Sequence, residues 1–594
     1  MRVSNRLASL RPGVLKFSRT TAAIVTIAIV AVFGSIGYNY GPEFYWYMLT
    51  AIVPAFAYGV LRRSVPLANA RVRARKRWMS HGPTVERVPY TQFEVFRATY
   101  LETTRDPRHG YVDDRTWRDL GMDEIHDRID VCFTIAGRNE LARILRHALP
   151  PSKLRDERVE LEERLRTDDD ARTRVAQSLA AIGEERDADP ASVLWNDVRR
   201  DSLFPMFVSM AAFAVVSIVL TAAVDVTLGV IAMLVVFVTN LWIYYRKARH
   251  ISIDIPALRV LSRMVSAREI PGVDELRREI SGAERAFRWL LTGAPSPSPT
   301  MSGDITEAVL LYVKIFFQID LIAYNRIISL IDRKRDRFQA LYQTIGSIDA
   351  VYALASYRAR RKRTCDATIT TGKRGRSTAD RPADSPLVLD GAYHPLVPKA
   401  VPNSVTIGRP GAIITGTNMA GKSTFLRTVG INVLFAQTTG YAFALEYRAP
   451  RLAVMSSIEK HDDLSSGKSF YFDEAERIYR MIEEVATDTP MLLLIDELLS
   501  GTNSLERESA SIAILHYLAE RNAVTLAATH DVAIANGVRD RYALHYFTDQ
   551  ADESGLTFDY RIHEGVVQTR NAIELLRLIG YPESVIAGAL ERTK

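Results

Sequence analysis

The chain has 594 residues, of which 24% are charged and 47% are hydrophobic, and its formal net charge is +7. A positive balance of this kind is typical of proteins that bind nucleic acid or the acidic head groups of a membrane. The two cysteines, Cys132 and Cys365, lack the spacing of metal ligands, which excludes a cysteine-based metal site and indicates a reducing compartment.

Four charge-free apolar stretches lie in the N-terminal half. They are Thr20–Tyr38, Phe44–Leu61, Leu203–Val224 and Val226–Tyr245. Each approaches or exceeds the roughly 20 residues with which a helix crosses the hydrocarbon core of a bilayer. Only Asn39–Glu43 joins the first pair, and little more than Asp225 joins the second. Two tight transmembrane hairpins are therefore expected.

Basic residues predict the orientation of these hairpins. Arg and Lys cluster before the first stretch, after the second, before the third and after the fourth, whereas the turns carry only Glu43 or Asp225. Because cytoplasmic flanks carry the excess of Lys and Arg, four spans with cytoplasmic termini are expected in a plasma or inner membrane. A cleaved signal peptide is disfavoured because a second span follows at once. Burial of the four stretches as soluble helices is the remaining alternative.

A further basic run precedes the C-terminal part. It contains Arg358, Arg360, Arg361, Lys362 and Arg363, then Lys373, Arg374 and Arg376, in a linker with Ser, Thr, Gly and Pro. This run could contact DNA phosphates, or it could remain solvated or face lipid. Both interpretations stay open.

A glycine-rich loop gives the clearest chemical prediction. The residues Gly416, Thr417, Asn418, Met419, Ala420, Gly421, Lys422, Ser423 and Thr424 satisfy G-x-x-x-x-G-K-[ST], a loop that binds nucleotide phosphates. The apolar run Ala412–Ile414 predicts a buried strand before it, and the sequence from Phe425 predicts a helix after it. In this setting backbone amides point at phosphate, Lys422 supplies a cation and Ser423 can ligate Mg²⁺. The motif predicts a site for a nucleoside triphosphate.

Two later strands end in residues that complete this site. The run Met491–Ile495 ends in Asp496 and Glu497, which can organise the Mg²⁺ shell and polarise the attacking water. The run Ala523–Ala528 leads to His530, which can reach a γ-phosphate and report its presence. The expected reaction is Mg²⁺-dependent ATP hydrolysis with Glu497 as the base.

These motifs together resemble the ATPase domain of the MutS family, the mismatch-repair ATPases and their relatives. The matching segments are His394-Pro395, Val401–Asn403, the phosphate loop, Asp462–Phe470, Asp496-Glu497, Gly501–Ser504, Ala528–His530 and Asn571–Ala587. The resemblance implies that Asp462–Phe470 is a signature loop whose Ser469 acts on the nucleotide of the opposite subunit. It implies that Asn571–Ala587 is a helical tail through which two chains pair, and hence a homodimer with two composite ATP sites.

The resemblance also has a weaker part and several departures. Trp117–Ile125 resembles the start of the family's helical core, and Ile345–Tyr357 resembles its last helix before the ATPase. The mismatch-reading domain has no counterpart, because Phe93-Glu94 lacks the spacing of the family's wedge. Thr417 stands where the family usually has Pro, and Ala400 where an adenine-stacking aromatic would be expected. The chain thus resembles a membrane-embedded MutS-related branch without mismatch recognition.

The expected fold is an α/β P-loop NTPase domain of ABC/MutS type, preceded by an all-α core and two transmembrane hairpins. The expected divisions are 1–65 for the first hairpin, 66–200 for a cytoplasmic helical segment, 201–246 for the second hairpin, 247–384 for helical core and basic linker, and 385–594 for the ATPase with its tail. The expected function is a membrane-anchored MutS-like ATPase. The alternatives are a DNA mismatch-repair or DNA-binding factor tethered to the membrane and, disfavoured by spans without ionisable residues, an ABC-type transporter.

Overall fold

The computed structural model describes residues 12–80, 82, 100–104, 110–148, 153–185, 188–196, 201–280, 282–284, 287, 305–370, 385–417, 420–459, 470–486, 490–552, 555–566 and 580–592. The chain separates into two compact units. The first comprises Met1–Thr103, Asp130–Leu141 and Glu162–Ser356, and the second comprises Thr104–Ile129, Ala142–Leu161 and Tyr357–Lys594. Each unit is described by itself.

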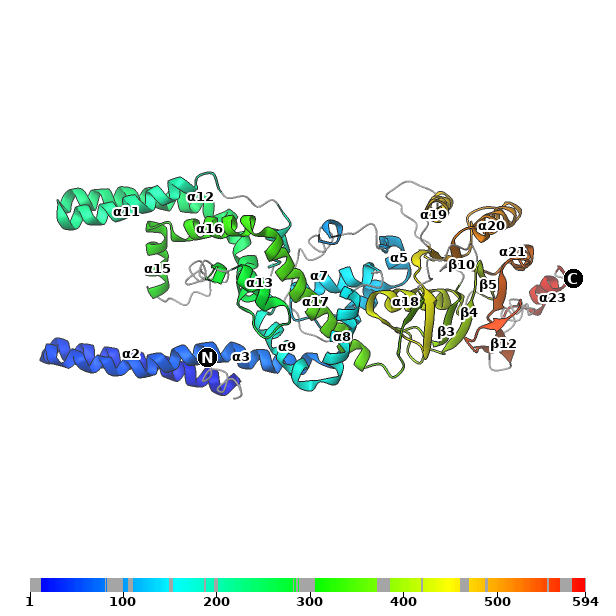
Figure 1. Ribbon diagram of the computed structural model, residues 1–594, viewed down its shortest axis with the longest axis horizontal. Coiled ribbons are helices and arrows are strands. Elements are labelled where there is room, and N and C mark those ends of the chain that lie inside the picture. Colours follow the sequence, from blue (N-terminus) through cyan, green and yellow to red (C-terminus); the bar gives the residue numbers. More distant parts are fainter. Residues whose placement is uncertain are drawn as a thin grey trace. The chain divides into compact units, whose positions relative to one another are not determined.

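The secondary-structure elements that the structure describes in the first unit are all helices (Figure 1). Its helices are α2 (Pro12–Tyr40), η1 (Pro42–Ala51), α3 (Ile52–Arg77), α9 (Asp169–Ile182), α10 (Ala191–Leu194), α11 (Phe204–Ala223), α12 (Val226–Ser266), α13 (Val273–Glu279), α15 (Ile305–Phe316) and α16 (Ile319–Arg333). Three others, α7 (Ile135–Arg146), α8 (Lys153–Thr167) and α17 (Arg335–Ala359), contribute to both units. Helix α2 packs against α3, and α11 packs against α12 (Figure 1).

Three helices in the described part of the chain are long and apolar enough to cross a membrane. They are Gly13–Tyr40, Phe204–Ala223 and Val226–Lys247. Most of their apolar side chains are exposed, among them Ile27, Val219 and Leu234. These helices are compatible with membrane insertion, because long rows of exposed aliphatic side chains are unfavourable in water.

The second expected span, Phe44–Leu61, differs from the other three. Gly41, at a φ of 134°, and Pro42 end α2, and the chain continues as the 3₁₀ helix η1. Helix α3 then begins at Ile52 and runs beyond the apolar stretch to Arg77. Among the described residues of this stretch, the apolar helical segment is the shorter Leu49–Tyr58. The four-span topology therefore stays a prediction.

A buried carboxylate joins two helices of the first unit. Asp349 of α17 accepts hydrogen bonds from the backbone N–H groups of Phe133 (3.0 Å) and Thr134 (2.8 Å), and from the Thr134 hydroxyl (2.7 Å), just before α7 begins. Burial raises the pKa of Asp349 to about 7. A Cβ on Gly137 would lie 2.3 Å from Asp349 Oδ2. The close approach of α17 to α7 therefore requires glycine at this position.

The second unit combines helices with strands. Its helices are α5 (Asp114–Asp119), α6 (Met122–Ile129), α18 (Lys422–Thr439), α19 (Phe470–Glu484), α20 (Ser504–Ala519), α21 (Val532–Gly537) and α23 (Glu583–Arg592). Its strands are β1 (Cys365–Asp366), β2 (Thr368–Thr370), β3 (Leu387–Ala392), β4 (Asn403–Ile407), β5 (Gly411–Thr415), β6 (Tyr441–Ala442), β7 (Glu446–Pro450), β8 (Ala453–Ser457), β9 (Met491–Asp496), β10 (Ala523–Thr529), β11 (Ala543–Tyr546), β12 (Asp549–Asp552), β13 (Gly555–Phe558) and β14 (His563–Glu564). An α-rich N-terminal part followed by mixed α/β sheets agrees with the predicted fold class.

A six-stranded sheet organises the second unit, with the strand order β14-β11-β5-β10-β9-β8. Strands β11, β5, β10, β9 and β8 are parallel, and β14 is antiparallel to β11. Thr529 of β10 lies opposite Thr415 of β5, and Ala528 lies opposite Asp496 of β9. Since parallel strands end at the same edge, the residues after β5, β9 and β10 are brought together.

Helices pack on both faces of this sheet. One face carries Leu493 and Ile495 of β9, which share a core with residues of α19, α20 and α21. The side chain of Leu494 points to the opposite face, because neighbours in a strand alternate. There it contacts α18, where a Cβ on Gly430 would lie 2.6 Å from Leu494 Cδ1. The strands predicted at Ala412–Ile414, Met491–Ile495 and Ala523–Ala528 correspond to β5, β9 and β10.

Candidate active site

The glycine-rich loop leads from the end of β5 into α18. Gly416 has a φ of 138° and Gly421 a φ of 104°, which only glycine adopts readily. A Cβ on Gly416 would lie 2.6 Å from the carbonyl oxygen of Phe547. Both glycines are thus required by the loop's geometry. Asn418 and Met419 lie outside the described residues, whereas Ser423 and Thr424 lie in the first turn of α18.

Lys422 turns its side chain back into this loop. It is only 3% exposed, and its ammonium donates hydrogen bonds to the carbonyl oxygens of Gly416 (2.6 Å) and Thr417 (3.0 Å). Burial lowers the pKa of Lys422, and the charges of Asp496 and Glu497 oppose that shift. The hydroxyl of Thr417 is buried and has no hydrogen-bond partner among the residues that the structure describes. The loop therefore presents a cation and an unpartnered hydroxyl together.

The predicted acids and histidine meet at the neighbouring strand ends. Asp496 ends β9, and Glu497 follows with a φ of 62° while its backbone N–H donates to Ala528 O (2.9 Å). Nδ1 of His530 lies 2.6 Å from Glu497 Oε1. When Glu497 is ionised it can only accept, so Nδ1 then carries the proton. The structure thus brings the loop, Lys422, Asp496, Glu497 and His530 to one edge of the sheet.

The predicted signature loop is only partly described. Residues 461–469, which include Ser469, lie outside the described residues, and α19 begins at Phe470. In the predicted helical tail, residues 571–579 also lie outside them, and α23 begins at Glu583. The roles expected for Ser469 and for the tail therefore remain predictions.

Sequence reasoning missed an aromatic residue beside the phosphate loop. Tyr560 Cδ1 lies 3.3 Å from the position that a Cβ on Gly421 would occupy, and Tyr560 is 45% exposed. Its ring stacks on Phe558, with ring centroids 5.8 Å apart. Asn403 holds the backbone around it, donating to Tyr560 O (2.9 Å) and accepting from Ile562 N (2.8 Å). The sequence signal for this aromatic pair is the F-x-Y spacing of Phe558 and Tyr560 just before β14, and two aromatic residues at that spacing are a weak indication of a site.

Sequence reasoning also missed how the start of the predicted signature loop is held. Asp119, a fully buried residue of α5, accepts hydrogen bonds from Ser456 Oγ (2.6 Å), Ile458 N (2.9 Å) and Glu459 N (3.1 Å). Arg427 of α18 donates to Asp119 O (2.7 Å) and pairs with Glu459 (3.1 Å). Asp119 and Arg427 therefore tie the helix of the phosphate loop to the chain entering residues 460–469.

The residues of this site lie in the region of the chain that is similar to known proteins. The family model for MutS domain V matches residues 412–594, which contain the phosphate loop and all later strand ends of the site. The DNA mismatch repair protein MutS of Thermus aquaticus is 32% identical over 207 residues, covering 34% of this chain and 25% of that protein. The C-terminal part of the chain, residues 412–594, therefore carries a domain of the MutS family.

Other MutS relatives match over a somewhat longer region. The DNA mismatch repair protein MutS 2 of Halobacterium salinarum is 28% identical over 268 residues, or 43% of this chain and 29% of that protein. MutS of Persephonella marina is 30% identical over 266 residues, with the same two shares. The chain thus matches 25–29% of the length of these curated relatives. The resemblance to the MutS family that the sequence motifs indicated is confirmed.

Proposed function

We propose that this chain is a membrane-anchored ATPase of MutS type, which binds ATP with Mg²⁺ at the edge of its six-stranded sheet and hydrolyses the γ-phosphate bond. The observation that carries the proposal is the convergence of the glycine-rich loop, Asp496, Glu497 and His530 at the ends of three adjacent parallel strands. A strand, glycine loop and helix, with an acidic strand end nearby, is the arrangement that a P-loop NTPase requires.

The residues present fit a nucleotide phosphate. Gly416 and Gly421 leave backbone space that a Cβ would occupy, and Lys422 is a buried cation held by carbonyl oxygens that a phosphate could replace. The unpartnered Thr417 hydroxyl can donate to a phosphate oxygen. Ser423 and Asp496 offer the oxygen ligands that Mg²⁺ prefers. When bound, Mg²⁺ supplies neutralisation of the phosphate charge.

Glu497 and His530 form the proposed hydrolytic pair. The Glu497 carboxylate accepts a proton from the attacking water, and the contact with His530 Nδ1 fixes its orientation. The positive φ of Glu497 costs on the order of 1–3 kcal/mol for a non-glycine residue, and such strain often marks a functional position. Through the same contact, His530 can sense whether Glu497 is bound to the attacking water.

Tyr560 is proposed to stack on the adenine ring. Its exposed ring beside Gly421 supplies the aromatic surface that Ala400 does not. Base–aromatic stacking contributes roughly 1–3 kcal/mol. The position of Asn403, bonded on both sides of Tyr560, keeps that ring beside the loop.

Assembly and surroundings complete the proposal. The three long apolar helices support anchoring in a lipid bilayer. The topology proposed with them, four spans and cytoplasmic termini, comes from the sequence pattern. By its resemblance the chain forms a homodimer in which Ser469 completes the site of the opposite subunit. The second candidate function, DNA binding in mismatch repair, rests on the names of the MutS relatives. Within the described residues, Arg358 pairs with Asp366 and Arg360 donates to Arg128 O, so these two basic side chains have partners inside their own unit.

The affinity for Mg²⁺-ATP tests the proposed site. Lys422→Ala removes a charge-assisted contact worth about 1.5–3 kcal/mol, so ATP should bind roughly tenfold to a hundredfold more weakly. Tyr560→Ala should weaken binding over a similar range, whereas Tyr560→Phe keeps the ring and should bind nearly as wild type. Equilibrium titration with a fluorescent ATP analogue in detergent measures all three. Equal affinity in wild type and Lys422→Ala would remove the loop from nucleotide binding.

A further inference from the structure

The last turns of α15, residues 311–316, bury their charged side chain and expose apolar ones. Tyr312 is 54% exposed and Val313 is 41% exposed, whereas the next residue, Lys314, is only 3% exposed. The Lys314 ammonium lies 3.2 Å from Asp320 Oδ1, and Asp320 is 5% exposed. A helix in water turns its charged side chains outward and its apolar ones inward. In a membrane, ionisable side chains face the protein interior and pair with one another.

The end of α15 contacts the apolar part of α12. The ring of Phe237 lies near those of Tyr312 and Phe316, with centroids 6.0 and 6.4 Å apart. The Asn240 amide donates to Phe316 O (2.6 Å), and the Gln318 amide donates to Asn240 O (2.9 Å). Phe237 and Asn240 belong to the helix segment Val226–Lys247, which is long and apolar enough to cross a membrane. The contact therefore lies within that segment.

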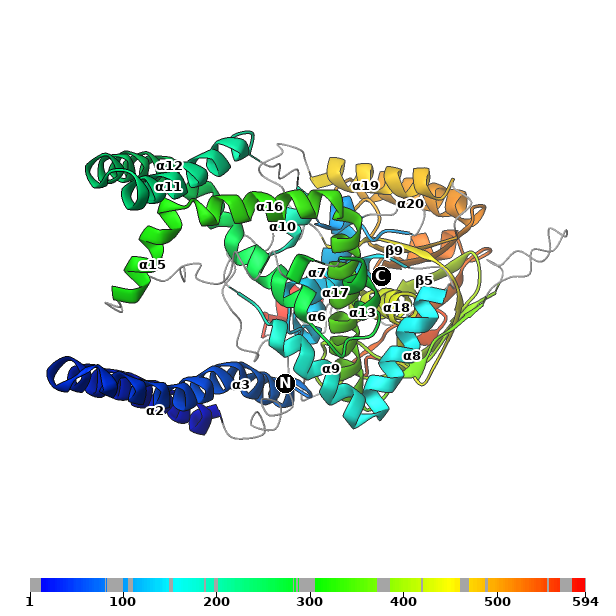
Figure 2. The same cartoon turned by 60° about the vertical axis from the view of Figure 1, so that its left-hand side comes forward.

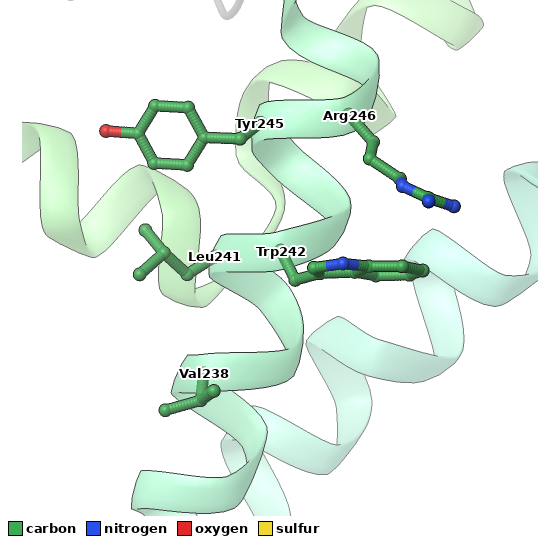
Figure 3. Close-up of a pocket in the computed structure, with 5 residues that line it drawn as sticks. All are labelled: Val238, Leu241, Trp242, Tyr245 and Arg246. Carbon is green, nitrogen blue, oxygen red and sulfur yellow. The ribbon is translucent and has the colours of Figure 1, made fainter.

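The depth of the α15–α12 contact in the bilayer follows from the geometry of α12. In Figure 3, Trp242 and Arg246 lie side by side on α12, with the Arg246 guanidinium 4.3 Å from the centre of the Trp242 ring, and Tyr245 points to the other side of the helix. Such aromatic and basic side chains mark the head-group region. Phe237 precedes Tyr244 by seven residues. At 1.5 Å per residue it lies roughly 10 Å from Tyr244 along α12, toward the apolar part of that helix. Interfacial helices bury their apolar face to about 5–10 Å.

We propose that α15 is an additional membrane element, an interfacial helix that lies in the cytoplasmic leaflet against α12. Figures 1 and 2 both show α15 running across the direction of α11 and α12, as a helix in the plane of a bilayer would. Tyr312 and Val313 then face the lipid acyl chains, and Lys314 turns inward to Asp320. The inference rests on the proposed membrane anchoring, and it adds a contact with lipid to a segment that the sequence assigned to a cytoplasmic core.

Depth-dependent fluorescence quenching tests the position of α15. Single cysteines replace Val313, Leu234 or Thr173 in full-length Cys365→Ser protein, in which Cys132 is buried. Each carries an environment-sensitive fluorophore, and the protein is reconstituted in phosphatidylcholine vesicles with doxyl groups at carbon 5 or carbon 12. All three sites are exposed, Leu234 on α12 and Thr173 on α9, so the substitutions should be tolerated.

The three labels separate the possible outcomes. We expect the label at 313 to be quenched more by the shallow doxyl group, the label at 234 more by the deep one, and the label at 173 by neither. A label at 313 that only aqueous iodide quenches, or that no quencher reaches, while 234 responds to lipid, overturns the inference and leaves the membrane anchor intact. If the label at 234 also escapes both lipid quenchers, the proposed anchoring fails as well.

Discussion

Glu497→Gln should keep ATP binding and lose about a hundredfold or more of the rate of ATP hydrolysis, the usual contribution of a positioned general base. The amide has nearly the shape of the carboxylate, but it cannot accept a proton from water. Binding should persist because the loop, Lys422 and Asp496 are unchanged. Phosphate release gives kcat, and titration with the fluorescent analogue gives the affinity.

A matched control separates chemistry from a general loss of structure. Glu520 caps the C-terminal end of α20 and pairs with Arg541, and its side chain is 62% exposed. It lies near the start of β10, whereas the site lies at the strand ends, so Glu520→Gln should hydrolyse ATP at the wild-type rate. Wild-type turnover in Glu497→Gln would remove Glu497 from the role of base. A variant that lost ATP binding together with turnover would point to a structural role instead.

Lys314→Met should destabilise the first unit by roughly 3–5 kcal/mol, because it removes the cation that pairs with the buried Asp320 carboxylate and leaves the long hydrogen bond from the Tyr244 hydroxyl (3.5 Å). Replacing both members, in Lys314→Met with Asp320→Leu, should restore most of that stability, since two apolar side chains bury no charge. Thermal unfolding of the purified protein in detergent measures both effects.

An exposed ion pair of the same unit provides the comparison. Arg337 and Glu279 pair at 2.8 Å with side chains that are 57% and 38% exposed, so Arg337→Gln should cost only about 0–1 kcal/mol. If Lys314→Met unfolds at the wild-type temperature, the Lys314–Asp320 pair is hydrated in solution. If the double variant is no more stable than the single one, the loss comes from packing and not from an unpaired charge.

The predictions that agree with the structure came from local patterns. The phosphate loop, the strands before and after it and the acidic strand end are each written in fewer than about ten consecutive residues, and each motif has a physical reason for its spacing. Asp496, Glu497 and His530 lie together because they end or follow β9 and β10, which are parallel neighbours in register. The family resemblance rested on the same segments.

The features that sequence reasoning missed depend on contacts between distant residues. The F-x-Y pattern around Tyr560 does not indicate that its ring lies beside Gly421, and nothing near Asp119 indicates that it binds the backbone of Ile458. The burial of Lys314 is also invisible in sequence, since it depends on Asp320 across a turn and on the packing of α12. Phe44–Leu61 looks like a single span by hydropathy, but residues around Pro42 start it as a 3₁₀ helix.

The central claim is that this chain, whose residues 412–594 match MutS domain V, hydrolyses ATP at the strand ends around Lys422. The most direct test measures phosphate release from ATP by the purified full-length protein in detergent. The assay is run with Mg²⁺ or with a chelator, and with or without duplex DNA. We expect Mg²⁺-dependent hydrolysis that Lys422→Ala abolishes, and acceleration by DNA would favour the DNA-binding alternative. Hydrolysis at the wild-type rate in Lys422→Ala, or no hydrolysis by a folded wild-type dimer, would contradict the claim.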